Sequence, residues 1–146
     1  MHCCSSSNRT LAFVVFRLTL GTNFLFHGLA RMLGGGVEGF ASGTTKAFAG
    51  TPLPPGIVHA FLAVLPYVEL ILGALILLGL FTRWALAAAG LLIAVLMFGT
   101  SMRADWVTVS IQMIYAIALY LALANLDDNC CSLDKLLSRS GAKSKP

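Results

Sequence analysis

The chain has 146 residues, of which 58% are hydrophobic and 11% charged, and its mean hydropathy is +0.84. Because a soluble domain is about a quarter charged, this composition excludes an ordinary water-soluble fold and predicts one membrane domain. The formal net charge of +4 does not indicate nucleic-acid binding, since the basic residues are scattered singly among lipid-like sequence.

Four apolar windows predict an all-α integral membrane protein, a bundle of four transmembrane helices. Each is close to the roughly 20 residues that cross about 30 Å of hydrocarbon. The first window carries Arg17 and lacks a small-residue cleavage pattern, so we expect a retained helix rather than a secretory signal. The windows cover residues 10–33, 57–80, 84–102 and 106–126.

A Gly- and Pro-rich outer loop, residues 34–56, joins the first two windows. Phe40 and Phe48 lie in it among small and polar residues, a pattern that predicts a short interfacial helix over residues 37–48. The prolines that follow are expected to end this helix before the second membrane helix begins.

The distribution of Lys and Arg predicts the orientation, because short cytoplasmic segments carry the excess of positive charge. We therefore expect a multi-pass protein of the inner (cytoplasmic) membrane with both termini in the cytoplasm. The tail, residues 127–146, is expected to be flexible, and either contacts anionic lipid or is simply solvated. The group expected at the cytoplasmic side is Arg9, Arg83, Lys135, Arg139, Lys143 and Lys145, and the opposite group is Arg31, Lys46 and Arg103.

Ionisable side chains inside a membrane helix are costly and usually face protein or water. Arg17 and Glu69 are placed at similar depths by the helical rise, about 10 Å and about 16 Å from the cytoplasmic surface. The sequence therefore predicts a buried ion pair between them. Gly21, Gly28 and Gly73, together with the pair at positions 90 and 94, predict close approach of the helix backbones.

Four further polar residues, His27, His59, Gln112 and Tyr115, fall toward the outer half of the predicted bundle. Two interpretations stay open. The four side chains line a pocket that binds a quinone or another small ligand by hydrogen bonds, or the buried polar groups only satisfy one another and fix which helices pair. A haem held by the two histidines is a weaker third interpretation, because two lone histidines are a poor signal.

The four cysteines form two vicinal pairs, Cys3–Cys4 and Cys130–Cys131. Both pairs are expected at the cytoplasmic surface, where thiols stay reduced. Because C-x-x-C spacing is absent, we predict no metal site and favour free or lipid-modified thiols.

Several short motifs resemble the DoxX family: the pair at 17–18 with residues 24–28, then residues 69–74, 78–83 and 50–54. The resemblance covers most of the first three helices and implies a four-helix inner-membrane protein, often linked to redox complexes or quinone stress. The resemblance also implies that Arg17, His27, Glu69 and Arg83 are shared polar positions. The vicinal cysteine pairs do not belong to the family's pattern.

The leading hypothesis is a membrane subunit of a quinone-linked redox complex, with no intrinsic cofactor and with quinone as the candidate ligand. The alternative is a non-catalytic structural subunit of a larger respiratory or photosynthetic assembly. Membrane lipids and other proteins, or further copies of the chain, are the expected partners. A small transporter is disfavoured because the sequence shows no inverted repeat or discontinuous helix pair, and no motif assigns a reaction to the chain alone.

Overall fold

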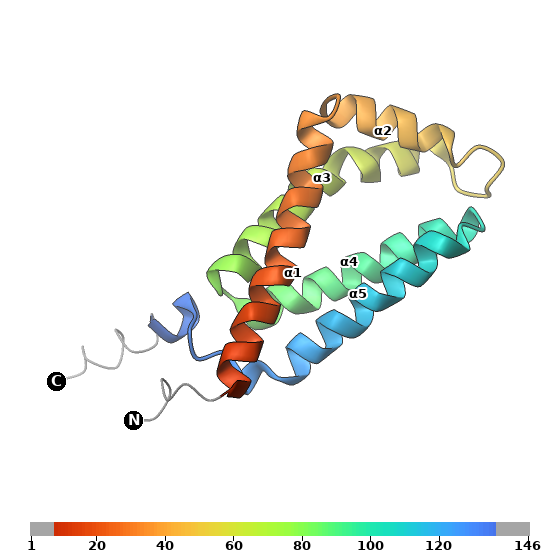
Figure 1. Cartoon of the computed structure of the whole chain (residues 1–146). Coiled ribbons are helices and arrows are strands. Elements are labelled where there is room, and N and C mark those ends of the chain that lie inside the picture. The colour runs from red at the N-terminus through yellow and green to blue at the C-terminus, as the bar shows by residue number, and fades with distance from the viewer. Residues whose placement is uncertain (1–7, 137–146) are drawn as a thin grey trace.

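The computed structural model describes residues 8–136, which are almost wholly helical (Figure 1). Four helices are long and apolar enough to cross a membrane, as predicted. A shorter helix, α2, lies between the first two of them. The elements are α1 (Asn8–Leu33), α2 (Gly36–Lys46), α3 (Pro55–Leu78), α4 (Thr82–Met102), α5 (Trp106–Ala124) and a 3-10 turn, η1 (Leu126–Asp128).

The observed boundaries follow from local chemistry. Pro55 is the first residue of α3, where its missing N–H costs nothing and its fixed φ favours the helix. Gly79 ends α3 in the left-handed conformation (φ 65°), which only glycine adopts easily. The second membrane helix therefore begins and ends two residues before the predicted range of 57–80. The short helix predicted at 37–48 is present as α2, one residue shorter than expected, and its interfacial position stays a prediction.

The helices α1 and α3 run antiparallel and pack along much of their length (Figure 1). Glycines make this contact possible. A Cβ added at Gly73 would lie 2.3 Å from the Leu25 backbone nitrogen, and one at Gly28 would lie 2.5 Å from the Pro66 carbonyl oxygen. Close approach at Gly21, Gly28 and Gly73 is confirmed, whereas a Cβ at Gly90 would meet nothing within 4 Å. Gly90 is therefore not a packing glycine within the described chain.

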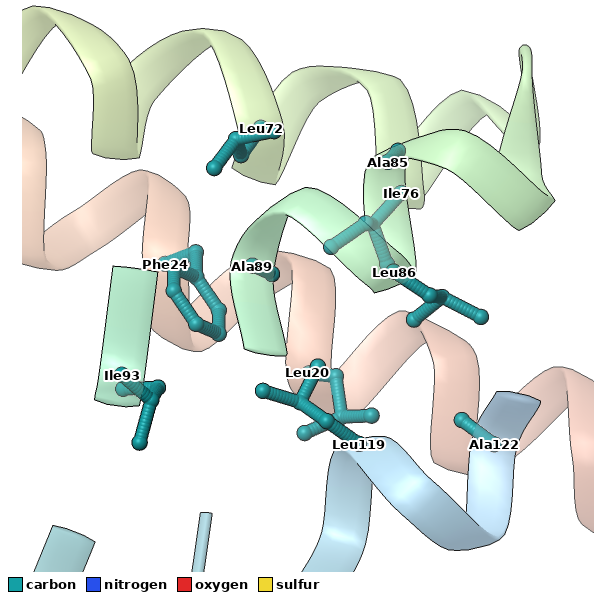
Figure 2. Close-up of a cluster of buried hydrophobic side chains, with 10 residues drawn as sticks. All are labelled: Leu20, Phe24, Leu72, Ile76, Ala85, Leu86, Ala89, Ile93, Leu119 and Ala122. Atoms are coloured by element: carbon teal, nitrogen blue, oxygen red, sulfur yellow. The ribbon is translucent and has the colours of Figure 1, made fainter. Parts of the chain in front are cut away.

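The main core joins α1 and α3 to the antiparallel pair α4 and α5 (Figure 2). Small residues on α4 let larger aliphatic and aromatic side chains of the other helices approach it. Burial of these apolar side chains against one another supplies the packing contacts that hold the bundle together. The cluster consists of Leu20, Phe24, Leu72, Ile76, Ala85, Leu86, Ala89, Ile93, Leu119 and Ala122.

A second cluster holds α2 against the beginning of α3. Ala41 of α2 is fully buried, and Val58, Leu62 and Leu65 of α3 surround it. Figure 1 shows α2 across the end of the bundle that lies opposite the marked chain termini. We call this the α2 end, and the other end, which carries the turn between α3 and α4, the terminal end.

The segment after α5 folds back onto the terminal end instead of being flexible from residue 127. The Asp134 carboxylate accepts hydrogen bonds from the backbone N–H groups of Phe81 (2.7 Å) and Thr82 (2.8 Å) and from the Thr82 hydroxyl (2.8 Å). Asp134 thus caps the first turn of α4, whose own N-cap residue, Phe81, offers no side-chain acceptor. The rest of the predicted tail, including Arg139, Lys143 and Lys145, lies outside the described residues.

Candidate functional site: a cavity at the α2 end

A cavity of about 370 Å³ lies between α2 and α3 on one side and α4 and α5 on the other. Most of its wall is aliphatic or aromatic, and a few polar groups of α1, α2, α4, α5 and the α4–α5 turn reach it. This combination of apolar walls with few polar groups is typical of sites that bind small organic ligands. The aromatic wall consists of Phe40, Phe48, Phe61 and Phe98, and the polar lining of Arg31, Thr44, Thr100, Arg103, Thr108 and Gln112.

Arg31 connects the cavity with the most deeply buried carboxylate of the described chain. Its guanidinium donates a hydrogen bond to Glu69 and forms an ion pair with it. The Glu69 side chain is 4% exposed and that of Arg31 24%. The same guanidinium lies 4.8 Å from the centre of the Phe40 ring, a cation–π contact that ties α1 to α2. Arg31 therefore neutralises a buried charge and forms part of the cavity wall.

The predicted ion pair between Arg17 and Glu69 is not formed. Arg17 instead donates to the carbonyl oxygens of Ile76 and Leu77 (both 2.9 Å) and of Cys131 (3.0 Å). Its guanidinium thus caps the end of α3, where the last carbonyls have no helical partner.

The reason is the register of α1 against α3. Arg17 lies against Gly79, at the end of α3, while Gly28 packs on Pro66 and Leu70. Glu69 therefore lies opposite position 27 of α1, about ten residues or about 15 Å along the helix from Arg17. Side chains tilt toward the N-terminus of their helix, so Arg31 reaches back over one turn to Glu69.

Gln112 is the one residue of the four predicted ligand-binding residues that lines the cavity. It is 9% exposed, and its Oε1 accepts a hydrogen bond from the Thr100 hydroxyl at 2.6 Å. Within residues 8–136 its amide nitrogen has no hydrogen-bond acceptor. This N–H₂ group is therefore a donor available to a ligand.

Arg103 lies at the turn between α4 and α5. Its guanidinium is 3.7 Å from an Asp105 carboxylate oxygen and 5.2 Å from the centre of the Phe48 ring. Asp105 caps α5 through the Thr108 hydroxyl (2.7 Å) and backbone N–H, and these two hydrogen bonds lower the pKa of the Asp105 carboxyl. Asp105 therefore stays ionised and holds Arg103 beside the cavity.

The other three predicted ligand-binding residues lie elsewhere. His27 is exposed on the outer surface of α1. The Tyr115 hydroxyl accepts a hydrogen bond from the Asn23 amide at 3.2 Å, between α1 and α5. None of His27, His59 and Tyr115 lines the cavity. The sequence placed these residues by depth alone, and depth does not determine which way a side chain points around its helix.

His59 joins α3 to α2 instead. Its Nε2 lies 3.1 Å from a Glu38 carboxylate oxygen and 3.5 Å from the Ser42 hydroxyl, which also donates to Glu38 at 2.7 Å. The hydrogen bond from Ser42, then that from His59 and its charge when protonated, lower the pKa of Glu38. The contact lies on the surface and helps to keep α2 on α3, next to the cavity.

The cysteines add no candidate metal centre within the described range. Among residues 8–136 no three His, Cys, Asp or Glu side chains lie close enough together to hold a metal ion. Cys130 and Cys131 lie at the terminal end, where Cys131 is exposed and Cys130 half-buried. Cys3 and Cys4 lie outside the described residues.

Sequence reasoning gave Arg31, Arg103 and Thr100 no role in a site. The two arginines were counted as charges of one membrane side, and Arg31 was also expected to share a bundle-facing stripe of the first helix with Gly28 and Phe24, but that stripe was interpreted as packing alone. That stripe was the available signal for Arg31. For Arg103 and Thr100 no sequence signal was available, because their place beside the cavity depends on how the α4–α5 turn faces α2.

Four membrane-length helices with a shorter fifth across one end define a polytopic helical membrane protein. Comparison with protein-family models matches residues 12–106 to the DoxX family, about two thirds of the chain. The protein therefore belongs to the DoxX family. Comparison with curated proteins and with solved structures finds no significant match.

Proposed function

We propose that this DoxX protein is a membrane subunit of a quinone-linked redox complex and that the cavity at the α2 end binds the quinone ring. The observation that carries the proposal is the unused amide N–H₂ of Gln112 in an apolar, aromatic-walled cavity. A quinone is an apolar ring with two carbonyl acceptors, so it needs such a slot with a donor inside it.

Charged donors support the same ligand. The Arg31 and Arg103 guanidiniums both line the cavity and both carry several N–H groups in a fixed plane. Each also contacts an aromatic ring of the wall, which holds the charge in place. A carbonyl oxygen becomes more negative when the ring accepts electrons, so nearby guanidiniums favour the reduced ring as well as the bound one.

This chain and its partner have different tasks in the proposal. Reduction of a quinone to a quinol needs two electrons and two protons. We assign the electrons to a partner protein that carries the redox cofactor, the protons to solvent water, and the binding of the ring to this chain. The exposed apolar faces of the membrane helices leave room for such a partner or for lipid.

The proposed orientation follows from the basic residues. Arg9, Arg83 and Lys135 lie toward the terminal end, and Arg31, Lys46 and Arg103 toward the α2 end. In the sequence, Arg139, Lys143 and Lys145 follow Lys135 and give that side the excess of positive charge. We infer from the positive-inside rule that the terminal end faces the cytoplasm, across the inner membrane. Labelling tests this placement, because Cys131 is exposed. A membrane-impermeant thiol reagent added to intact cells should not label Cys131, and labelling would reverse the orientation.

A binding titration tests the cavity. Purified protein in detergent is titrated with a short-chain quinone, and the bound fraction is measured by equilibrium dialysis. Gln112→Leu removes one neutral donor and should weaken binding about two- to tenfold. Arg103→Gln removes a charged donor and should weaken it about tenfold or more.

His27→Phe is the matched control, since His27 is exposed and does not line the cavity, and it should leave the affinity unchanged. Loss of affinity in that variant alone would place the ring on the outer face of α1 instead. If the unaltered protein binds no quinone, the alternative of a non-catalytic structural subunit holds.

A further inference from the structure

A second hollow, about 590 Å³ in volume, lies at the terminal end, between the beginning of α4 and the end of α5. Its apolar wall extends from the helix ends into the membrane-spanning part, at Ala87 and Leu123. Trp84, 72% exposed, forms its edge, and tryptophan is favoured where a membrane helix meets the headgroup layer. The hollow therefore opens where lipid headgroups lie.

Opposite charges line the same hollow. The Arg83 guanidinium lies 5.9 Å from the centre of the Trp84 ring and is exposed, with no carboxylate partner within residues 8–136. The Asp134 carboxylate lies in the wall, held by Phe81 and Thr82. Burial raises the pKa of the Asp134 carboxyl, whereas these hydrogen bonds and the positive charge of Arg17 lower it. The lowering effects are larger together, so the net shift of the pKa is downward. Asp134 therefore stays ionised near neutral pH.

A buried acceptor in this wall has no partner. Asn129 is 5% exposed and lines the hollow, and its amide nitrogen donates to the Thr82 hydroxyl at 3.0 Å. Its Oδ1 is buried and has no hydrogen-bond partner in the described chain. Buried polar atoms are normally satisfied, so an unpaired oxygen beside a hollow points to a donor from outside the chain.

We propose that this hollow binds a phospholipid whose headgroup carries a primary ammonium. The phosphate would pair with Arg83, and the three N–H groups of the ammonium would be shared between the Asp134 carboxylate and the Asn129 Oδ1. The acyl chains would lie on the apolar wall. A purely anionic headgroup would meet the Asp134 charge, and a quaternary ammonium has no N–H to donate, so both fit less well.

The test compares three phospholipids with identical acyl chains, so that contacts of the chains cancel. Phosphatidylethanolamine, phosphatidylcholine and phosphatidylglycerol are added separately to the purified full-length protein in detergent, and bound lipid is counted by native mass spectrometry. We expect phosphatidylethanolamine to bind about fivefold more tightly than either of the other two. Equal affinity for the three, or equal affinity for phosphatidylethanolamine and phosphatidylglycerol, would overturn the proposal.

Asp134→Asn removes the charge that attracts the ammonium and should remove most of this preference, whereas Asp127→Asn, an equal change of charge on an exposed residue nearby, should keep it. Arg83→Gln should weaken the binding of all three lipids alike, because each carries the phosphate, and Lys46→Gln, at the α2 end, should not. A preference that survives Asp134→Asn would show that the ammonium is not bound in this hollow. Because the three lipids are also compared on the unaltered protein, the result does not depend on how the variants fold.

Discussion

The pairing of Glu69 with Arg31 rather than with Arg17 can be tested by a double-mutant cycle. Arg31→Leu leaves the Glu69 carboxylate, with a side chain only 4% exposed, without its partner. Removing one member of a buried ion pair costs about 3–5 kcal/mol of unfolding free energy. Glu69→Leu should cost less, about 1–2 kcal/mol, because Arg31 lines the cavity and can reach solvent there.

The double variant Arg31→Leu/Glu69→Leu should be little worse than Glu69→Leu alone, since neither charge is then left unpaired. The coupling energy should therefore be close to the loss for Arg31→Leu alone, about 3 kcal/mol or more. The unfolding free energies are measured by reversible denaturation in mixed micelles and extrapolated to zero denaturant.

The cycle between Arg17 and Glu69 serves as the control. Arg17 donates to main-chain carbonyls at the end of α3, so its loss and that of Glu69 should add within about 0.5 kcal/mol. Additive losses for Arg31 and Glu69, or strong coupling between Arg17 and Glu69, would refute the register of α1 on α3 described above.

Three further predictions concern packing, capping and acid stability. Gly73→Ala should destabilise the protein by at least about 1–3 kcal/mol, because the new Cβ would meet the α1 backbone at 2.3 Å, whereas Gly90→Ala, measured in the same denaturation assay, should be neutral or slightly stabilising. Asp134→Ala should lower the unfolding free energy by about 1 kcal/mol through loss of the α4 cap. This is at the low end for a cap because the carboxylate is partly solvated. Asp127→Ala, on an exposed residue nearby, should leave the unfolding free energy almost unchanged. Because the pKa of Asp134 is lowered by folding, its stabilising effect is present above the ordinary carboxyl pKa of 3.8 and is lost as the pH falls through the lower, folded value. Unfolding free energies measured from pH 5 down to about pH 2.5 should therefore fall less steeply in Asp134→Asn than in the unaltered protein, and equal slopes would contradict this account.

The helices themselves were predictable from the sequence. An apolar run of membrane length has to satisfy its own backbone groups in lipid, so length and composition alone fix the number and type of elements. The close contact of α1 with α3 was also visible, because glycines on both helices permit it. Gly90 shows the limit of that argument, since the same residue type lies on an open face of α4.

The partners of the polar side chains needed the tertiary structure. Counting residues along each helix predicted similar depths for Arg17 and Glu69. In the structure α1 extends past the end of α3, so Arg17 lies beside the last carbonyls of α3 and donates to them. Glu69 lies further along α1 and pairs with Arg31. A similar limit explains why His27 and Tyr115 were expected in one pocket. The sequence gives the depth of a residue, whereas rotation about the helix axis depends on every contact with the neighbouring helices.

Local hydrophobicity, glycine and proline in the sequence thus sufficed to predict a four-span helical membrane protein with a short helix between its first two spans. The residues that surround the cavity at the α2 end, and those that close the terminal end, depend on the tertiary structure. Arg103 contacts the Phe48 ring, and Asp134 accepts a hydrogen bond from Thr82, although each pair is more than fifty residues apart in the chain. Such contacts depend on the register and tilt of packed helices, which no local pattern encodes.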